Sequence, residues 1–205
     1  MLQKSTRRYV LLDRDGTLNV EKNYLSDPAE LELLPGVAKG LKLLQSHGFG
    51  LVVLSNQSGI GRGILTTSAV DAIHARLREL LHRKGVRLDG IYYCPHSPQQ
   101  KCICRKPSPG MIYRASEDLK FDPQESFVVG DKASDIEMGQ RVKAKTILVL
   151  TGYGKEAAPG AVKPDLVAED FAEAAAMIIR GVKAKDRRRK GEVGRQRASG
   201  GNPVS

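Results

Sequence analysis

The 205-residue sequence contains no tryptophan, and its four phenylalanines and six tyrosines make up only 5% of the chain. It also lacks any stretch that approaches the roughly 18 consecutive apolar residues of a membrane span. The first eight residues lack the apolar core of a secretion signal. These absences exclude a membrane-spanning helix and favour a cytoplasmic protein whose length suits one well-buried domain.

Cysteine is scarce, and its three copies, Cys94, Cys102 and Cys104, fall within eleven residues. In a reducing compartment such a cluster indicates a metal site before a disulfide framework. The pattern is Cys94-x-His96 and, after five residues, Cys102-x-Cys104. Four such ligands with no spare position describe a closed, structural Zn²⁺ site; the alternative is buried cysteines beside an unrelated histidine. The other histidines are predicted to lie on helix surfaces: His47, His74 and His82.

The formal net charge of +10 is unevenly distributed along the chain. From Lys183 onward there are eight Lys or Arg residues against Asp186 and Glu192, with few apolar residues. This composition predicts a disordered basic tail over residues 183–205, following a single domain over residues 1–182. The tail has no aromatic residue to stack on bases, so a solvated terminus is favoured over a nucleic-acid contact.

Short apolar runs alternate with helical periodicity through most of the chain. Strands are predicted at residues 9–12, 50–55, 90–94, 126–130, 145–150 and 165–167. Helices are predicted over residues 37–47, 66–84, 110–119, 131–142 and 170–181. This alternation predicts an α/β, Rossmann-like fold of three layers, with a parallel sheet and helices on both faces. The polar, turn-rich composition of residues 19–35 predicts a small flap over the first strand, and no large cap domain is expected.

Polar residues follow four of the predicted strands at their carboxyl ends, where open α/β sheets bind their ligands. Asp13 and Asp15 follow the first strand. Because side chains alternate along an extended chain, both project to one side and can share a cation or divide catalytic roles. Ser55 ends the second strand, Lys106 follows the cysteine loop after the third, and Asp131 follows the fourth. Taken singly, each could be a solvated loop charge, a loop cap or a helix N-cap.

In chain order, these residues resemble the four sequence motifs of haloacid-dehalogenase-type phosphatases. The motifs are Asp13-x-Asp15-Gly16-Thr17, the strand-terminal Ser55, Lys106 before Pro107, and Gly130-Asp131-x-x-x-Asp135. Within that superfamily, residues 56–59 and the cysteine loop resemble the zinc-containing D-glycero-D-manno-heptose 1,7-bisphosphate phosphatases and the related histidinol-phosphatase domain. The resemblance covers residues 8–180.

The resemblance implies an enzyme that removes the 7-phosphate of the heptose bisphosphate, in nucleotide-activated heptose biosynthesis for lipopolysaccharide. Asp13 is expected to attack the phosphate and form an aspartyl-phosphate intermediate. Asp15 is expected to protonate the leaving oxygen and then to activate the water that hydrolyses the intermediate. Ser55 and Lys106 are expected to contact the transferring phosphoryl group.

A catalytic Mg²⁺ is expected beside the aspartate pair, because a carboxylate attacking a phosphate monoester needs a cation to offset their mutual repulsion. The resemblance places Asp13, Asp131 and the backbone carbonyl of Asp15 on this ion. It also places Lys132 at the edge of the metal site, where contact would come through its backbone. Asp135 is expected to pair with Lys106.

Substrate recognition rests on fewer residues. The resemblance places eight of them against the sugar bisphosphate: Glu21, Lys22, Asn23, Tyr24, Asn56, Gln57, Ser58 and Arg105. The short spacing from His96 to Cys102 is more like the histidinol-phosphatase domain, whereas residues 58–63 are more like the heptose group. Heptose bisphosphate is therefore favoured and histidinol phosphate is the first alternative. A nucleic-acid 3′-phosphatase or nucleic-acid-binding protein is the more distant one. A monomer with a small-molecule partner is expected.

Overall fold

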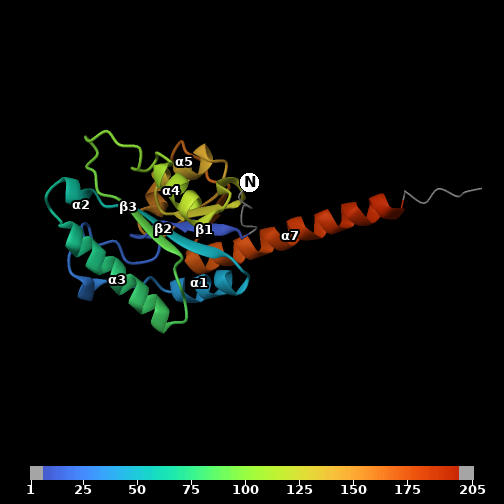
Figure 1. The fold of residues 1–205 in the computed structure, drawn as a ribbon, viewed down its shortest axis with the longest axis horizontal. Coiled ribbons are helices and arrows are strands. Elements are labelled where there is room, and N and C mark those ends of the chain that lie inside the picture. The colour runs from blue at the N-terminus through green and yellow to red at the C-terminus, as the bar shows by residue number, and fades with distance from the viewer. Residues whose placement is uncertain (1–6, 199–205) are drawn as a thin grey trace, which may run out of the picture.

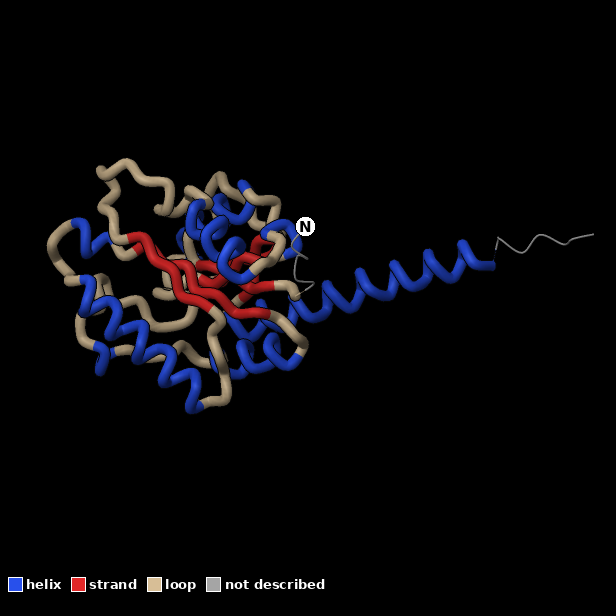
Figure 2. Tube along the Cα trace, in the orientation of Figure 1, coloured by secondary structure: helices blue, strands red, loops and turns tan. Residues whose placement is uncertain are grey.

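A six-stranded parallel sheet runs through the middle of the protein (Figures 1 and 2). The computed structural model describes residues 7–198, with side chains described as far as residue 184. The strand order is β3-β2-β1-β4-β5-β6. The strands are β1 (Tyr9–Leu12), β2 (Gly50–Asn56), β3 (Gly90–Cys94), β4 (Phe127–Gly130), β5 (Lys145–Val149) and β6 (Leu166–Ala168).

Helices cover both faces of this sheet (Figure 1). One face carries α1 (Val37–Ser46), α3 (Thr67–Arg83) and α7 (Phe171–Ala198). The other face carries α4 (Gly110–Leu119) and α5 (Ala133–Arg141). Four short helices lie in the connections: η1 (Pro28–Glu30), α2 (Ser58–Gly61), η2 (Pro123–Glu125) and α6 (Gly154–Ala157). The predicted three-layer α/β fold and all six predicted strands are confirmed.

Strand β1 separates the two hydrophobic cores and starts the functional edge of the sheet. Val10 and Leu12 belong to the core under α1, α3 and α7, while Tyr9 and Leu11 belong to the core under α4 and α5. This alternation explains why the strand is apolar at every position. The strand order reverses at β1, with β2 on one side and β4 on the other, so the chain leaving β1 enters a crevice at the carboxyl edge.

The predicted flap over residues 19–35 packs on the domain through buried Leu25 and Leu31 and contains η1. Among the described residues there is no separate cap domain. No helix within residues 7–198 is long and apolar enough to cross a membrane.

The last helix is longer than predicted. It was expected to end near Gly181, but α7 continues to Ala198, so the backbone of residues 183–198 is helical rather than irregular. This stretch consists mostly of good helix formers, and its two glycines, Gly191 and Gly194, do not interrupt the helix. Among the described side chains, Val182 is the last that packs on the apolar core, and the remainder of the helix extends away from the domain (Figure 1). A tail separate from the domain stays a prediction, and residues 199–205 lie outside the described residues.

Deleting residues 184–205 should change the melting temperature by less than about 2 °C, because surface changes away from packing contacts rarely matter more. Thermal unfolding of the full and shortened chains measures this. Ile178→Ala is the comparison within the same helix, since that buried side chain should cost about 2–5 kcal/mol. A truncation as destabilising as Ile178→Ala would mean that the end of α7 packs on the domain.

Candidate active site

Three carboxylates and one ammonium meet at the carboxyl edge of the sheet. Oxygens of Asp13, Asp131 and Asp135 all lie within 4.8 Å of one another. The Lys106 Nζ lies 2.6 Å from Asp13 Oδ1 and 2.6 Å from Asp135 Oδ1, and donates to the Leu54 carbonyl at 3.0 Å. All four charged side chains are buried. The structure therefore brings together four charged residues from three separate segments, which follow β1, β3 and β4.

The charges in this cluster do not balance. Burial alone would lower the pKa of Lys106, but Asp13 and Asp135 raise it, so the ammonium stays charged. Burial, together with the neighbouring Asp13, raises the pKa of Asp131 to about 8, and Asp131 Oδ1 is buried without a hydrogen-bond partner. An unsatisfied carboxylate oxygen among three acids fits a hard divalent cation such as Mg²⁺, which takes oxygen ligands. Asp13 and Asp131 are placed to hold it.

Two glycines leave just enough room for Asp131. A Cβ on Gly16 or on Gly152 would lie 2.2 Å from Asp131 Oδ2, and both glycines have positive φ angles, +82° and +52°. The Tyr153 amide donates to the same oxygen at 2.9 Å, and the Thr151 hydroxyl donates to the Gly16 carbonyl at 2.6 Å. The loop after β5 and the turn after β1 therefore fix this carboxylate from two sides.

Asp15 is oriented by a separate set of donors. Arg14 donates to it from Nε at 3.0 Å and from Nη2 at 2.7 Å, and Asn19 and Gln57 donate at 3.0 and 3.1 Å. Burial would raise the pKa of Asp15, but these donors and the Arg14 charge outweigh it and hold the pKa below its usual range. The carboxylate also lines a cavity, so it faces the space where a substrate would bind.

The end of β2 joins the two halves of the site. The Gln57 amide donates to Ser55 Oγ at 2.7 Å as well as to Asp15. Asn56 pairs twice with the Lys106 backbone: its Oδ1 accepts from the amide at 3.0 Å and its Nδ2 donates to the carbonyl at 3.2 Å. Asn56 and Gln57, expected to bind substrate, therefore also position Lys106, Ser55 and Asp15.

A cavity of about 260 Å³ opens beside Asp15. Six of the eight expected substrate-binding residues line it: Glu21, Asn23, Tyr24, Asn56, Gln57 and Ser58. Lys22 and Arg105 are not among its lining residues, and Arg105 donates to the His96 carbonyl. A larger cavity of about 340 Å³ lies at the opposite edge, where β4, β5 and β6 begin, away from the acids. The smaller cavity is therefore the candidate substrate site.

Lys132 lies at one wall of this cavity. Its ammonium pairs with Glu21 at 3.1 Å and lies 4.7 Å from the centre of the Tyr153 ring. Its backbone amide donates to Asp135 Oδ2, and its carbonyl accepts from the Asp135 amide at the start of α5. Both backbone groups are thus already bonded, and the expected backbone contact with a metal ion stays a prediction.

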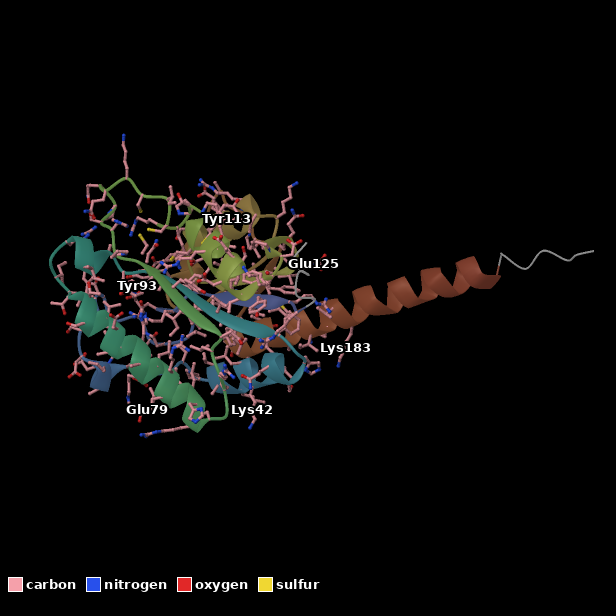
Figure 3. All side chains as sticks on the ribbon, viewed as in Figure 1. Lys42, Glu79, Tyr93, Tyr113, Glu125 and Lys183 are labelled. Atoms are coloured by element: carbon pink, nitrogen blue, oxygen red, sulfur yellow. The ribbon has the colours of Figure 1, made fainter. Side chains whose placement is uncertain are left out.

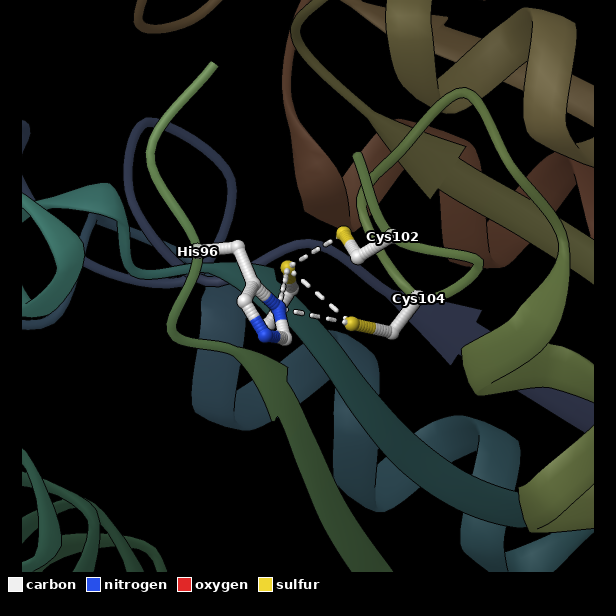
Figure 4. A group of neighbouring side chains, drawn as sticks. His96, Cys102 and Cys104 are labelled. Atoms are coloured by element: carbon white, nitrogen blue, oxygen red, sulfur yellow. Dashed lines mark hydrogen bonds between the residues drawn. The ribbon is translucent and has the colours of Figure 1, made fainter. Parts of the chain in front are cut away.

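The cysteine loop after β3 brings its four expected ligands together, and His96, Cys102 and Cys104 point toward one another in Figure 4. Cys94 Sγ lies 3.7 Å from Cys102 Sγ and 3.2 Å from Cys104 Sγ, while His96 Nδ1 lies 3.5 Å from Cys94 and 3.3 Å from Cys104. Tetrahedral ligands about 2.3 Å from a zinc ion would place sulfurs about 3.8 Å apart. The cluster is compatible with zinc.

Three residues of this region were not assigned a site role from the sequence. Tyr153 lines the cavity after β5, a strand end whose loop was not considered. Arg14 is fully buried between the two aspartates. His74 was expected on a helix surface, and this was wrong: it is 6% exposed and bonds to Arg14. Its helical spacing from Val70 and Leu77, both buried, was the signal that could have placed it inside.

Fold and site together define a hydrolase of the haloacid-dehalogenase-like class. A family model described as HAD-hydrolase-like matches residues 103–174. The solved structure of the D,D-heptose 1,7-bisphosphate phosphatase from B. bronchiseptica, with magnesium and phosphate, is similar with a TM-score of 0.80 and 32% identity, over 85% of this chain and 99% of that one. The corresponding enzyme of Burkholderia thailandensis gives a TM-score of 0.67 and 30% identity over 84% and 99%.

Curated relatives are closer in sequence. The D-glycero-beta-D-manno-heptose-1,7-bisphosphate 7-phosphatase of Haemophilus ducreyi is 43% identical over 169 residues, which is 78% of this chain and 92% of that relative. The Escherichia coli K12 protein of the same name is 41% identical over 151 residues, 70% of this chain and 79% of that relative. The chain belongs to the family of D-glycero-beta-D-manno-heptose-1,7-bisphosphate 7-phosphatases.

Gly152→Ala should weaken binding of a divalent cation by about tenfold or more, because the added methyl group must displace the Asp131 carboxylate. Titration calorimetry with Mg²⁺ measures the affinity. Gly48→Ala is the matched control, since Gly48 has a φ of +82° but nothing lies within 4 Å of its Cβ position. Equal losses in both variants would assign the effect to backbone strain rather than to Asp131.

Proposed function

We propose that the chain is a Mg²⁺-dependent phosphatase that removes the 7-phosphate of D-glycero-beta-D-manno-heptose 1,7-bisphosphate. The observation that carries this is the Asp13, Asp15 and Lys106 arrangement beside a 260 Å³ polar cavity, in a chain 43% identical to a relative of that name. A place in nucleotide-activated heptose biosynthesis, a cytoplasmic location and a monomeric state are part of the same proposal.

The first step is phosphoryl transfer to the enzyme. A carboxylate oxygen of Asp13 attacks phosphorus, and the bond from phosphorus to the sugar oxygen breaks. Asp15 gives a proton to the leaving oxygen. Because its donors hold its pKa low in the free protein, Asp15 takes up this proton when the negatively charged phosphate binds beside it. Lys106 keeps Asp13 in place through its contact with Oδ1, and Ser55 contributes a hydroxyl to the phosphoryl oxygens. The product is an aspartyl-phosphate at Asp13 and a free sugar hydroxyl.

The second step restores the enzyme. A water molecule attacks the phosphorus of the aspartyl-phosphate while Asp15 removes its proton. The bond from phosphorus to Asp13 breaks, and inorganic phosphate leaves. Asp13, Asp131 and the Asp15 backbone carbonyl would hold Mg²⁺, which when bound offsets the charges of the attacking carboxylate and the phosphate. Lys132 would lie at the edge of that site.

The flap and the loop after β2 would select the sugar. Glu21, Asn23, Tyr24 and Ser58 line the cavity on the side away from the buried acids. Asn23 and Tyr24 have positive φ angles of 41° and 73°, an uncommon conformation for residues with side chains. Backbone strain of this kind supports a functional role for the flap. Lys22 and Arg105 keep a proposed role in substrate binding from family resemblance alone.

The cysteine cluster would hold a structural Zn²⁺ through Cys94, His96, Cys102 and Cys104. Burial raises the pKa of the Cys94 thiol to about 12, so the thiolate form needs a cation beside it. The chain continues from the last ligand through Arg105 to Lys106, and the ion therefore would anchor the lysine that binds Asp13.

Phosphate release from the beta heptose 1,7-bisphosphate should require Mg²⁺ and exceed release from histidinol phosphate by about tenfold or more in kcat/KM. A panel that adds the alpha anomer and a 3′-phosphorylated oligonucleotide separates the alternatives. Asp13→Asn should release no phosphate from any substrate while keeping its circular dichroism spectrum. Histidinol phosphate is the main alternative substrate because of the short spacing from His96 to Cys102. Faster turnover of histidinol phosphate would contradict the proposed substrate.

Cys102→Ser should lower both zinc content and melting temperature, because a closed site loses one of four ligands. Metal analysis and thermal unfolding measure the two effects. Ile103→Ser is the matched control, since Ile103 lies between two ligands but its side chain is 83% exposed. A Cys102→Ser protein with full stability and no zinc would remove the anchoring role.

A further inference from the structure

We infer that His74 is a positioning residue for the acid-base carboxylate: it holds Arg14, and Arg14 fixes Asp15. The inference rests on the proposed function for the role of Asp15. The contacts of His74 with Arg14 and of Arg14 with Asp15 do not depend on that proposal. His74 comes from α3, and Arg14 and Asp15 follow β1, so the arrangement links a helix on one face of the sheet to the functional edge.

Arg14 is an unusual residue for the interior, since its side chain is only 1% exposed. A buried guanidinium needs partners for its N–H groups, because unpaired donors of a charged group are costly. Nε and Nη2 donate to both oxygens of Asp15, at distances of 2.7 to 3.1 Å. Two parallel bonds of this kind fix the plane of the carboxylate as well as its position.

His74 takes the other side of the guanidinium, where Arg14 Nη1 lies 3.1 Å from His74 Nε2. Burial and the Arg14 charge lower the pKa of His74 to about 4, so the ring is neutral near pH 7. Arg14 can only donate, and Nε2 therefore accepts while Nδ1 carries the ring proton. With Nη1 paired in this way, the guanidinium is held from both ends.

The surroundings keep His74 in place. Its ring centre lies 5.2 Å from that of Tyr93 on β3, and the Tyr93 hydroxyl donates to Asp71, one turn earlier on α3. In Figure 3, Glu79 lies toward the C-terminal end of α3, and Tyr93 lies near the N-terminal end of that helix. Glu79 is exposed and pairs with Arg76 on the outer side of α3. The apolar stripe of α3 carries one polar residue among Val70, Ile73, Leu77 and Leu81. A bond to buried Arg14 explains that exception.

Loss of this bond should impair both proton transfers assigned to Asp15, and only the first of them depends on the leaving group. Without an acceptor at position 74, Nη1 gains by turning toward the polar cavity that Arg14 lines, and the hold on Asp15 loosens. Proton transfer to the leaving oxygen then suffers, whereas binding of the phosphate does not. A sugar alkoxide needs that proton to leave, while 4-nitrophenolate leaves readily without it.

His74→Leu should lower kcat/KM for heptose 1,7-bisphosphate by about tenfold or more, a cost expected for a misplaced catalytic group, and mainly through kcat. The loss for 4-nitrophenyl phosphate should be several times smaller. His74→Gln, whose Oε1 can occupy the place of Nε2, should recover most of the loss, whereas the shorter His74→Asn should not. His82→Leu, at an exposed histidine of the same helix, should leave both substrates unaffected.

Equal losses of kcat/KM on the two substrates, or no rescue by glutamine, would overturn the inference and leave His74 a packing residue. Should His74→Leu fail to fold, the comparison of the Gln and Asn variants decides in its place. A crystal structure of either defective variant with Arg14 unmoved on Asp15 would also overturn it. If the wild-type protein hydrolyses histidinol phosphate but no heptose bisphosphate, the proposed function fails, and the leaving-group comparison is made on histidinol phosphate.

Discussion

The buried ammonium of Lys106 is the interaction on which the rest of the site depends. Its Nζ lies 2.6 Å from oxygens of both Asp13 and Asp135. Without this ammonium, three carboxyl groups would be buried together with no positive charge in contact with them. Even with it, negative charge is in excess, and Asp131 keeps an unpaired oxygen. That surplus suits the pocket to a divalent cation, which when bound would offset the charges of a carboxylate and a phosphate.

Rigidity of this site comes from bonds between its loops rather than from any one of them. Asn56 ties the end of β2 to Lys106, Thr151 ties the loop after β5 to Gly16, and the cysteine cluster closes the loop after β3. Asn56 and Thr151 thus each support a residue of the site that another loop carries. Groups preorganised in this way need little rearrangement as charge develops in the transition state, which is how electrostatic catalysis gains its effect.

Much of the architecture could be read from the chain because strands and helices leave local periodic patterns. All six strands and the strand-end acids were found that way, and the cysteine spacing pointed to the cluster of three cysteines and His96. The end of α7 was missed because Gly181 was taken as the end of the helix, whereas the helix-forming residues that follow it continue to Ala198. His74 was missed because a histidine on an amphipathic helix is compatible with either face until its partner is known. Tyr153 was missed because the loop after β5 was not considered, although it follows a strand end as the other site loops do.

The sequence by itself determined which elements form and which residue types stand at their ends, since both follow from local preferences and side-chain chemistry. Only the tertiary structure decided the strand order β3-β2-β1-β4-β5-β6, because each pairing joins segments far apart in the chain. The same is true of the partners of Arg14, the cradle of Asp131 and the pairing of Asn56 with Lys106. Those contacts depend on distances between elements, which no local pattern records.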